Sequence, residues 1–167
     1  MTGRTILAAV VSAFLMFMWG FFFWGLSGMS TSLMEPLPGE ADITAVLRSQ
    51  RAPTGMYVYP MPVDPGNEEA HAEWEKKHEE GPILQMAYRA EGGPVMSPAV
   101  LAKGLGHYFV VALLTCILLS MVVNRLPGYG SRVGFVLLIG LISAIWANGG
   151  DAIWWFHSLK YSLGNTA

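Results

Sequence analysis

The chain has 167 residues, of which 53% are hydrophobic and only 13% are charged, whereas about 25% of the residues in ordinary soluble domains are charged. This composition, with a mean hydropathy of +0.41, is typical of membrane proteins and argues against a soluble domain. The single cysteine, Cys116, excludes an internal disulfide and a cysteine-based zinc site. Charge is uneven, because residues 29–96 contain eleven of the twelve acids and five of the ten bases, a net charge of −6. We therefore expect a water-facing acidic middle between membrane-embedded ends.

Residues 6–28 form an uncharged apolar run, and a helix needs about 20 such residues to cross a bilayer. The run is longer than the apolar core of a typical signal peptide, and no small-residue cleavage site follows it. We therefore interpret residues 1–28 as an N-terminal transmembrane helix that is retained as an anchor.

The acidic middle, residues 29–96, predicts a small α+β cap. The spacing of Ile43, Val46 and Leu47 predicts a short amphipathic helix over 40–50. Asn67 is typical of a helix N-cap and begins a charged helix that ends at Gly81. Two runs rich in β-branched and aromatic residues, 56–59 and 83–89, predict strands. With no disulfide, a segment of this size has a marginal core, so we expect it to rest on the membrane helices or on a partner.

Two further spans follow the cap. Ser97 and Pro98 are typical of an N-cap and a first helical residue, and they open a second transmembrane helix over 97–124. Residues 133–148 predict a third. The segment 149–167 either continues the third helix past Gly149 and Gly150 or bends there into an interfacial aromatic helix. The expected fold class is all-α transmembrane with three spanning helices and a small α+β extracytoplasmic cap.

Basic residues suggest the orientation of these helices. Arg4 precedes the first span, and Arg125 and Arg132 flank the turn between the second and third spans. Because such residues favour the cytoplasmic side, we expect a multi-pass protein of the bacterial inner membrane. Its N-terminus would be cytoplasmic, and its cap and C-terminus extracytoplasmic.

Small residues recur along each span at helical spacing, and such residues let membrane helices approach closely. Cys116 is interpreted as one of these packing positions. The predicted helix-packing residues are Gly20, Gly25 and Gly28 on the first span, Ala112, Cys116 and Ser120 on the second, and Gly140, Ala144 and Ala147 on the third.

Three sets of polar residues suggest chemistry. His71, Glu75 and His78 have a spacing that can hold zinc or copper, but the acids that crowd the same segment favour a solvated helix face. His107 and His157, the two histidines predicted as cofactor ligands, could ligate a haem from two helices, or one histidine beside Trp154 and Trp155 could ligate a chlorophyll-type pigment. The alternative is that both are interfacial residues. Asp151 is interpreted as a helix N-cap after Gly149 and Gly150, with an intramembrane functional acid as the alternative.

Several short segments resemble those of small bacterial inner-membrane proteins to which no chemistry is assigned. These segments are GRTIL at 3–7, FMWGFFFWG at 17–25, GMYVYP at 55–60, GPILQMAYRAEGGPVMSP at 81–98 and YGSRVGF at 129–135. The resemblance covers most of the chain. It implies membrane placement and carries over no catalytic residue.

The sequence contains no nucleophile–base pair and no phosphate-binding glycine loop, so we expect a protein that is not an enzyme. The leading hypothesis is an accessory subunit of a larger bacterial membrane complex, such as an electron-transfer or energy-converting assembly. The alternatives are a cofactor-binding subunit that uses His107 and His157, and an acidic docking platform for a basic soluble partner such as a c-type cytochrome. We expect no cofactor, no nucleic-acid partner, and contact with lipid and with other subunits in a homo- or hetero-oligomer.

Overall fold

The computed structural model describes residues 3–166. The chain divides into two compact units, one that combines Met1–Glu35 with Pro94–Ala167 and one that contains Pro36–Gly93. The second unit is thus an insertion between the first and second spans.

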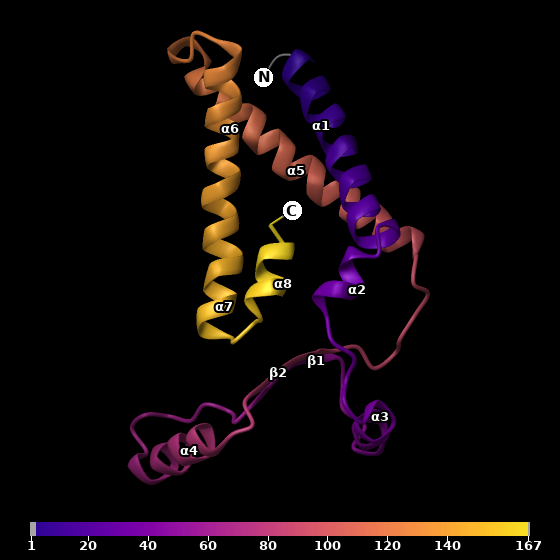
Figure 1. Ribbon diagram of the computed structural model, residues 1–167, viewed down its shortest axis with the longest axis vertical. Helices are drawn as coiled ribbons and strands as arrows, with labels where there is room; N and C mark the ends of the chain where they lie inside the picture. Colours follow the sequence, from indigo (N-terminus) through magenta and orange to yellow (C-terminus); the bar gives the residue numbers. More distant parts are fainter. Residues whose placement is uncertain (1–2, 167) are drawn as a thin grey trace. The chain divides into compact units, whose positions relative to one another are not determined.

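The first unit contains three apolar helical segments that are long enough to cross a membrane, Gly3–Leu26, Pro98–Arg125 and Tyr129–Trp154. This confirms the predicted number of spanning helices. The helices of this unit are α1 (Gly3–Phe21), α2 (Met29–Leu33), α5 (Pro98–Val122), α6 (Tyr129–Ala144), α7 (Gly150–Trp154) and α8 (Leu159–Gly164) (Figure 1).

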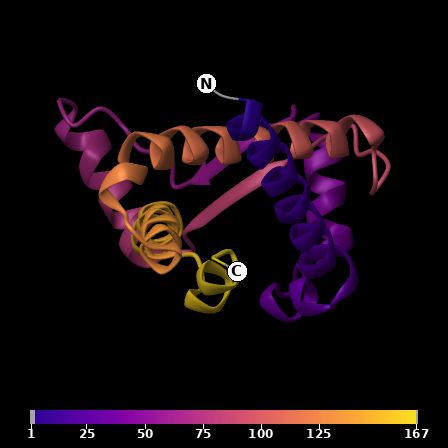
Figure 2. The same cartoon turned by 90° about the horizontal axis from the view of Figure 1, so that it is seen from above.

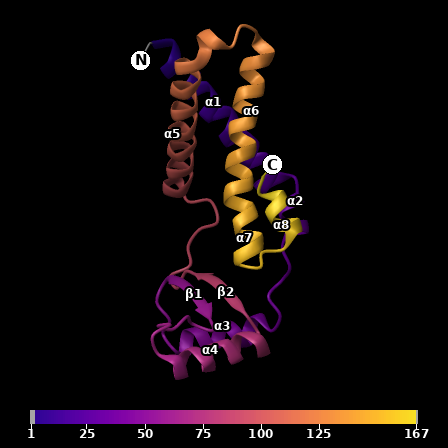
Figure 3. The same ribbon diagram turned by 90° about the vertical axis from the view of Figure 1, so that its left-hand side faces the viewer.

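The N-terminal end of α1 and the turn between α5 and α6 lie at the same end of the long helices (Figures 1 and 3). Arg4, Arg125 and Arg132 therefore belong to one end of this unit. In that turn, Arg132 Nε donates a hydrogen bond to the carbonyl of Leu126 (3.1 Å). The grouping of the bases is the arrangement on which the positive-inside rule acts.

The core of the first unit lies between α1 and α5, which cross each other (Figure 2). Ala9, Ala13 and Ala112 are buried there, and Tyr108 and Leu113 pack around them. Alanine at these positions keeps the two backbones close, as in other membrane helix pairs. By contrast, none of the described residues in the most apolar stretch of the third span is buried.

The third span is longer than the sequence predicted. Helix α6 passes into a π-helical turn, Ile145–Gly149, and then into α7 without leaving helical backbone angles at Gly149 or Gly150. Continuation, rather than a bend at the two glycines, is therefore the alternative that the structure adopts. It keeps the backbone N–H and C=O groups hydrogen-bonded within the helix, which lipid requires.

The interpretation of Asp151 as an N-cap is wrong. Asp151 lies inside the continuous helical segment, and α7 has no side-chain cap. Its carbonyl accepts hydrogen bonds from the backbone N–H groups of Trp155 (3.1 Å) and His157 (3.3 Å). The helix ends after Trp154, where Phe156 has a left-handed φ of 55° and redirects the chain into α8.

The second unit has the two short helices and two strands that the sequence predicts. Helices α3 (Glu40–Ser49) and α4 (Glu68–Glu80) flank β1 (Gly55–Tyr59) in the chain, and β2 (Leu84–Tyr88) follows. The strands pair antiparallel, from Gly55 opposite Tyr88 to Tyr59 opposite Leu84. Asn67 caps α4 as predicted, because its side chain accepts from the N–H of Ala70 (3.1 Å). Neither helix has a buried residue among those described, which fits the marginal core expected from its size.

A side-chain hydrogen bond closes the open end of the strand pair. Thr54 Oγ1 accepts from the backbone N–H of Ala90 (2.9 Å) and donates to Glu91 Oε2 (2.6 Å). The bond from Thr54 favours the ionised carboxylate and lowers the pKa of Glu91 below its ordinary value.

We predict that Thr54→Val raises the pKa of Glu91 toward its ordinary value, as measured by carboxyl-carbon NMR of the full chain in nanodiscs. Because the native pKa is depressed, this contact stabilises the strand ends above the unfolded pKa, and the contribution is lost as pH falls through the folded pKa. Thr44→Val is the control, because Thr44 Oγ1 bonds only within α3, to Glu40 and Ala41. An unchanged Glu91 titration in Thr54→Val would contradict the assignment.

Candidate functional site

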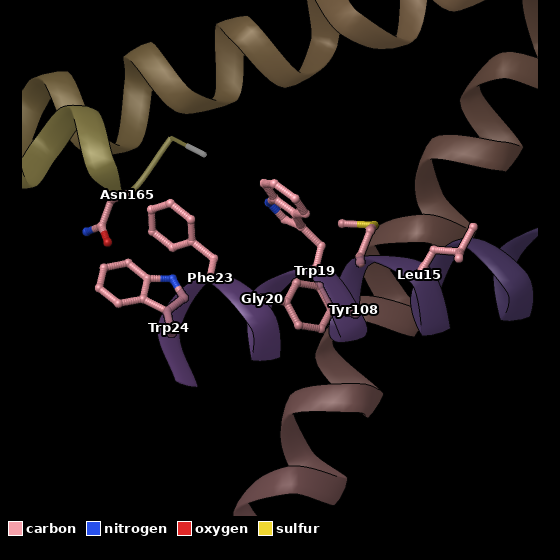
Figure 4. A pocket seen from close by; sticks show the side chains of 8 residues that line it. Leu15, Trp19, Gly20, Phe23, Trp24, Tyr108 and Asn165 are labelled. Carbon is pink, nitrogen blue, oxygen red and sulfur yellow. The ribbon is translucent and has the colours of Figure 1, made fainter. Parts of the chain in front are cut away.

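The candidate functional site is a cavity of about 500 Å³ in the first unit, which we call the aromatic pocket (Figure 4). It is lined by side chains from the end of the first span, from α5 and from the C-terminal segment that follows α8. The lining residues are Leu15, Met16, Trp19, Gly20, Phe23, Trp24, Tyr108 and Asn165. Its volume is in the range of small-molecule sites in proteins, about 300–1,000 Å³.

A π-helical turn, Phe22–Leu26, places the aromatic rings of the pocket. The N–H of Ser27 bonds to the carbonyl of Phe22 (2.9 Å), and Ser27 Oγ donates to the carbonyl of Phe23 (2.7 Å). Phe23 is buried, and its ring meets Trp24 edge to face, with 5.2 Å between the centroids. Such turns inside α-helices are frequent at functional sites, because they change which side chains share a face.

Another wall of the aromatic pocket forms where α1 and α5 approach each other closely, at Gly20 and Tyr108. A Cβ atom on Gly20 would lie 2.8 Å from Tyr108 Oη, so only glycine leaves room for this tyrosine. The ring of Tyr108 also meets Phe17 edge to face, at 6.4 Å between centroids. Gly20 therefore determines where Tyr108 lies beside the pocket.

The C-terminal segment brings Asn165 to the pocket because α8 folds back onto α2. Ser158 caps α8 by accepting from the N–H of Tyr161 (3.2 Å). Lys160 Nζ lies 3.7 Å from Glu35 Oε1, and Leu33 lies directly against Gly164. In Figure 4 the amide of Asn165 lies beside the rings of Phe23 and Trp24.

A second cavity, of about 660 Å³, adjoins the aromatic pocket and shares Leu15 and Met16 with it. We call it the apolar crevice. Residues of α1, α5 and α6 line it, namely Ala8, Ser12, Leu15, Met16, Val111, Ala112, Thr115, Cys116, Leu119, Val136, Ile139, Gly140 and Ser143. The hydroxyl of Thr115 donates to the carbonyl of Val111 (2.9 Å) within its own helix. This donor therefore needs no hydrogen-bond acceptor from a molecule in the crevice.

The structure does not assemble the predicted metal set of His71, Glu75 and His78. His71 Nδ1 lies 3.5 Å from Glu75 Oε1, but Trp74 packs between the two histidines, with ring centroids 5.4 Å from His71 and 5.5 Å from His78. Across residues 3–166, no group of three His, Cys, Asp or Glu side chains is arranged to hold a metal ion.

The two histidines predicted as cofactor ligands lie in different surroundings. His107 is an exposed residue of α5 whose ring packs on Tyr108 (5.8 Å between centroids). His157 lies in the turn after α7, half-buried, and packs on Tyr161 (5.8 Å). Each imidazole thus has a tyrosine neighbour from its own segment.

The predicted small residues have different surroundings. Ala112 is buried between α1 and α5, Cys116 packs at the edge of that core, and Ser120 Oγ donates to the carbonyl of Ile117 (2.6 Å). A Cβ on Gly25 would lie 3.8 Å from the side chains of Phe21 and Met96, whereas Gly28 has a left-handed φ of 71° and separates the first span from α2. A Cβ on Gly140 would meet open space, Ala144 is half-buried and Ala147 is exposed.

Sequence reasoning missed Ala9, Ala13 and the pocket residues Tyr108 and Asn165. Ala9 and Ala13 are four residues apart, and small residues at that spacing favour close helix contact. This spacing could have predicted the face of α1 that packs on α5. No local signal marks Tyr108 or Asn165, which reach the pocket only through contacts between distant segments.

Comparisons of the chain with protein-family models, with curated proteins and with solved structures give no match. The resemblance to small inner-membrane proteins therefore stays a prediction, and the site is defined by its geometry.

We predict that Gly20→Ala lowers the thermal stability of the detergent-solubilised chain, because the new methyl group would displace Tyr108 and overpacking costs about 1–3 kcal/mol. Gly106→Ala is the matched control on α5, since a Cβ there meets no atom within 4 Å, and alanine favours helix over glycine. Thermal unfolding followed by circular dichroism compares the two. Equal midpoints for both variants would contradict the tight approach at Gly20.

Proposed function

We propose that the protein is a non-catalytic accessory subunit of a larger bacterial membrane complex. The observation that carries this proposal is the third span, whose most apolar stretch has none of its described residues buried against the rest of the chain. Lipid can cover large aliphatic side chains, but small residues facing outward are typical of contacts between membrane helices. Ala147 is exposed and the half-buried Ala144 lies one turn before it, so this part of the third span would receive a helix of another subunit, whereas Gly140 lines the apolar crevice.

The two other functional hypotheses have weaker support. A haem held by two histidines would need both ligands in one place, and the rings of His107 and His157 pack instead on Tyr108 and Tyr161. An acidic docking platform would use the second unit. Part of its charge is balanced within α4, where Lys76 pairs with Glu80 and Lys77 with Glu73.

We expect the chain to purify in mild detergent as part of a species larger than its own 18.2 kDa. Ala144→Leu with Ala147→Leu should release it from that species, because the added side chains would block close helix contact. The control is Ile142→Phe, an enlargement at a residue that is 59% exposed on the opposite face of α6. A lone, monodisperse chain in the unsubstituted protein would refute the proposal.

We further propose that the membrane is the bacterial inner membrane, with the N-terminus cytoplasmic and the second unit and C-terminus extracytoplasmic. The support is the grouping of Arg4, Arg125 and Arg132 at one end of the long helices and the excess of acids in the inserted unit.

Cysteine labelling tests this orientation in a Cys116→Ala background. A membrane-impermeant maleimide should label Glu79→Cys in intact cells with a permeabilised outer membrane, because α4 would face outward. It should label Ser131→Cys, in the first turn of α6, only after lysis. The reverse pattern would overturn the orientation.

A further inference from the structure

We propose that the aromatic pocket and the apolar crevice together bind a lipid-soluble quinone-type molecule. Its neutral planar ring lies in the aromatic pocket and its isoprenoid tail lies in the crevice. This inference does not rest on the proposed assembly, because both cavities are built from residues of this chain.

The ring end of the site is defined by aromatic side chains from two helices. Trp19, Phe23 and Trp24 come from the end of the first span, and Tyr108 comes from α5. The ring of Trp19 is tilted by 33° to that of Phe23, and Phe23 meets Trp24 at 76°. Offset and edge-to-face contacts of this kind favour another flat ring as the occupant.

The polar groups at this end match a neutral head group. The Asn165 amide carries both donors and an acceptor, and the Tyr108 hydroxyl adds another donor. Quinone oxygens accept such hydrogen bonds. Among the described lining residues none has a charged side chain, so a phosphate or an ammonium group would lose its hydration without an opposite charge.

The tail end follows from the shared wall of the two cavities. Leu15 and Met16 line both, so the two cavities lie against each other at these side chains, and the tail of a ring in the pocket would run past them into the crevice. The crevice wall is mostly aliphatic, and Thr115 is hydrogen-bonded within its helix. A molecule with a planar polar ring and a long apolar tail therefore fits both cavities at once.

The test uses the full chain in nanodiscs and a photoreactive benzoquinone with a decyl tail, whose cross-linked residues are mapped by mass spectrometry. We expect labels on residues 15–24 and beside Tyr108. Trp19→Leu with Trp24→Leu should reduce labelling about tenfold, since two ring contacts are lost. The control pair is Trp146→Leu with Trp154→Leu, which removes two tryptophans that are 84% and 76% exposed. Equal loss in the control pair would overturn the proposal.

Two further variants separate the ring from the tail. Gly140→Leu fills open space in the crevice and should weaken labelling by the decyl probe, but not by a probe without a tail. Asn165→Leu leaves the three long helices intact and should weaken both probes about fivefold, the effect of one hydrogen bond. Asn165→Leu therefore tests binding of the ring in the aromatic pocket even if the double tryptophan variant does not fold.

A photoreactive phosphatidylglycerol of matched tail length tests the competing lipid. It should label the crevice weakly and the aromatic pocket not at all. Equal labelling of the pocket by this lipid would show a general lipid site and overturn the quinone assignment, as would unchanged quinone labelling in Asn165→Leu.

Discussion

The three long helices of the first unit are long and apolar enough to cross a membrane, and a helix inside lipid must hydrogen-bond every backbone group within itself. Water is absent from the hydrocarbon core, so a spanning segment stays helical even through residues that end helices in soluble proteins. The third span therefore passes through Gly149 and Gly150 as a π-helical turn and α7. The first span also ends in a π-helical turn, Phe22–Leu26. In the first span, the deviation from α-helical geometry redirects aromatic side chains without exposing backbone groups.

Small residues then decide where the helices meet and where cavities remain. Ala9, Ala13 and Ala112 bring α1 and α5 together, and Gly20 lets Tyr108 lie against α1. Helix α6 joins this pair through the turn after α5, and cavity rather than packed side chains separates it from α1. The apolar crevice is thus a consequence of packing two helices tightly and the third loosely.

The sequence predicted the three spans and the strands and helices of the acidic segment, because hydropathy and local turn residues determine them. It did not predict how far the third span extends, since the glycines after Asn148 are typical of a break in water. It also could not predict the aromatic pocket. Asn165 reaches that pocket only because Ser158 caps α8, Lys160 pairs with Glu35 and Gly164 accommodates Leu33. The Lys160–Glu35 and Gly164–Leu33 contacts join residues more than a hundred positions apart, and no local pattern encodes them.

The two proposals meet on α6. Val136, Ile139 and Gly140 line the crevice, and the small-residue face continues from Gly140 to Ala144 and Ala147. A tail in the crevice would contact Gly140, and a partner helix would lie next to it at Ala144 and Ala147. If a partner helix orders α6 against α1 and α5, the tail no longer has to meet the entropy cost of ordering α6. The partner would then increase the affinity for the tail. By thermodynamic reciprocity the tail then tightens partner binding by the same factor. On these two proposals, a loosely packed third span would couple a membrane-soluble ligand to assembly.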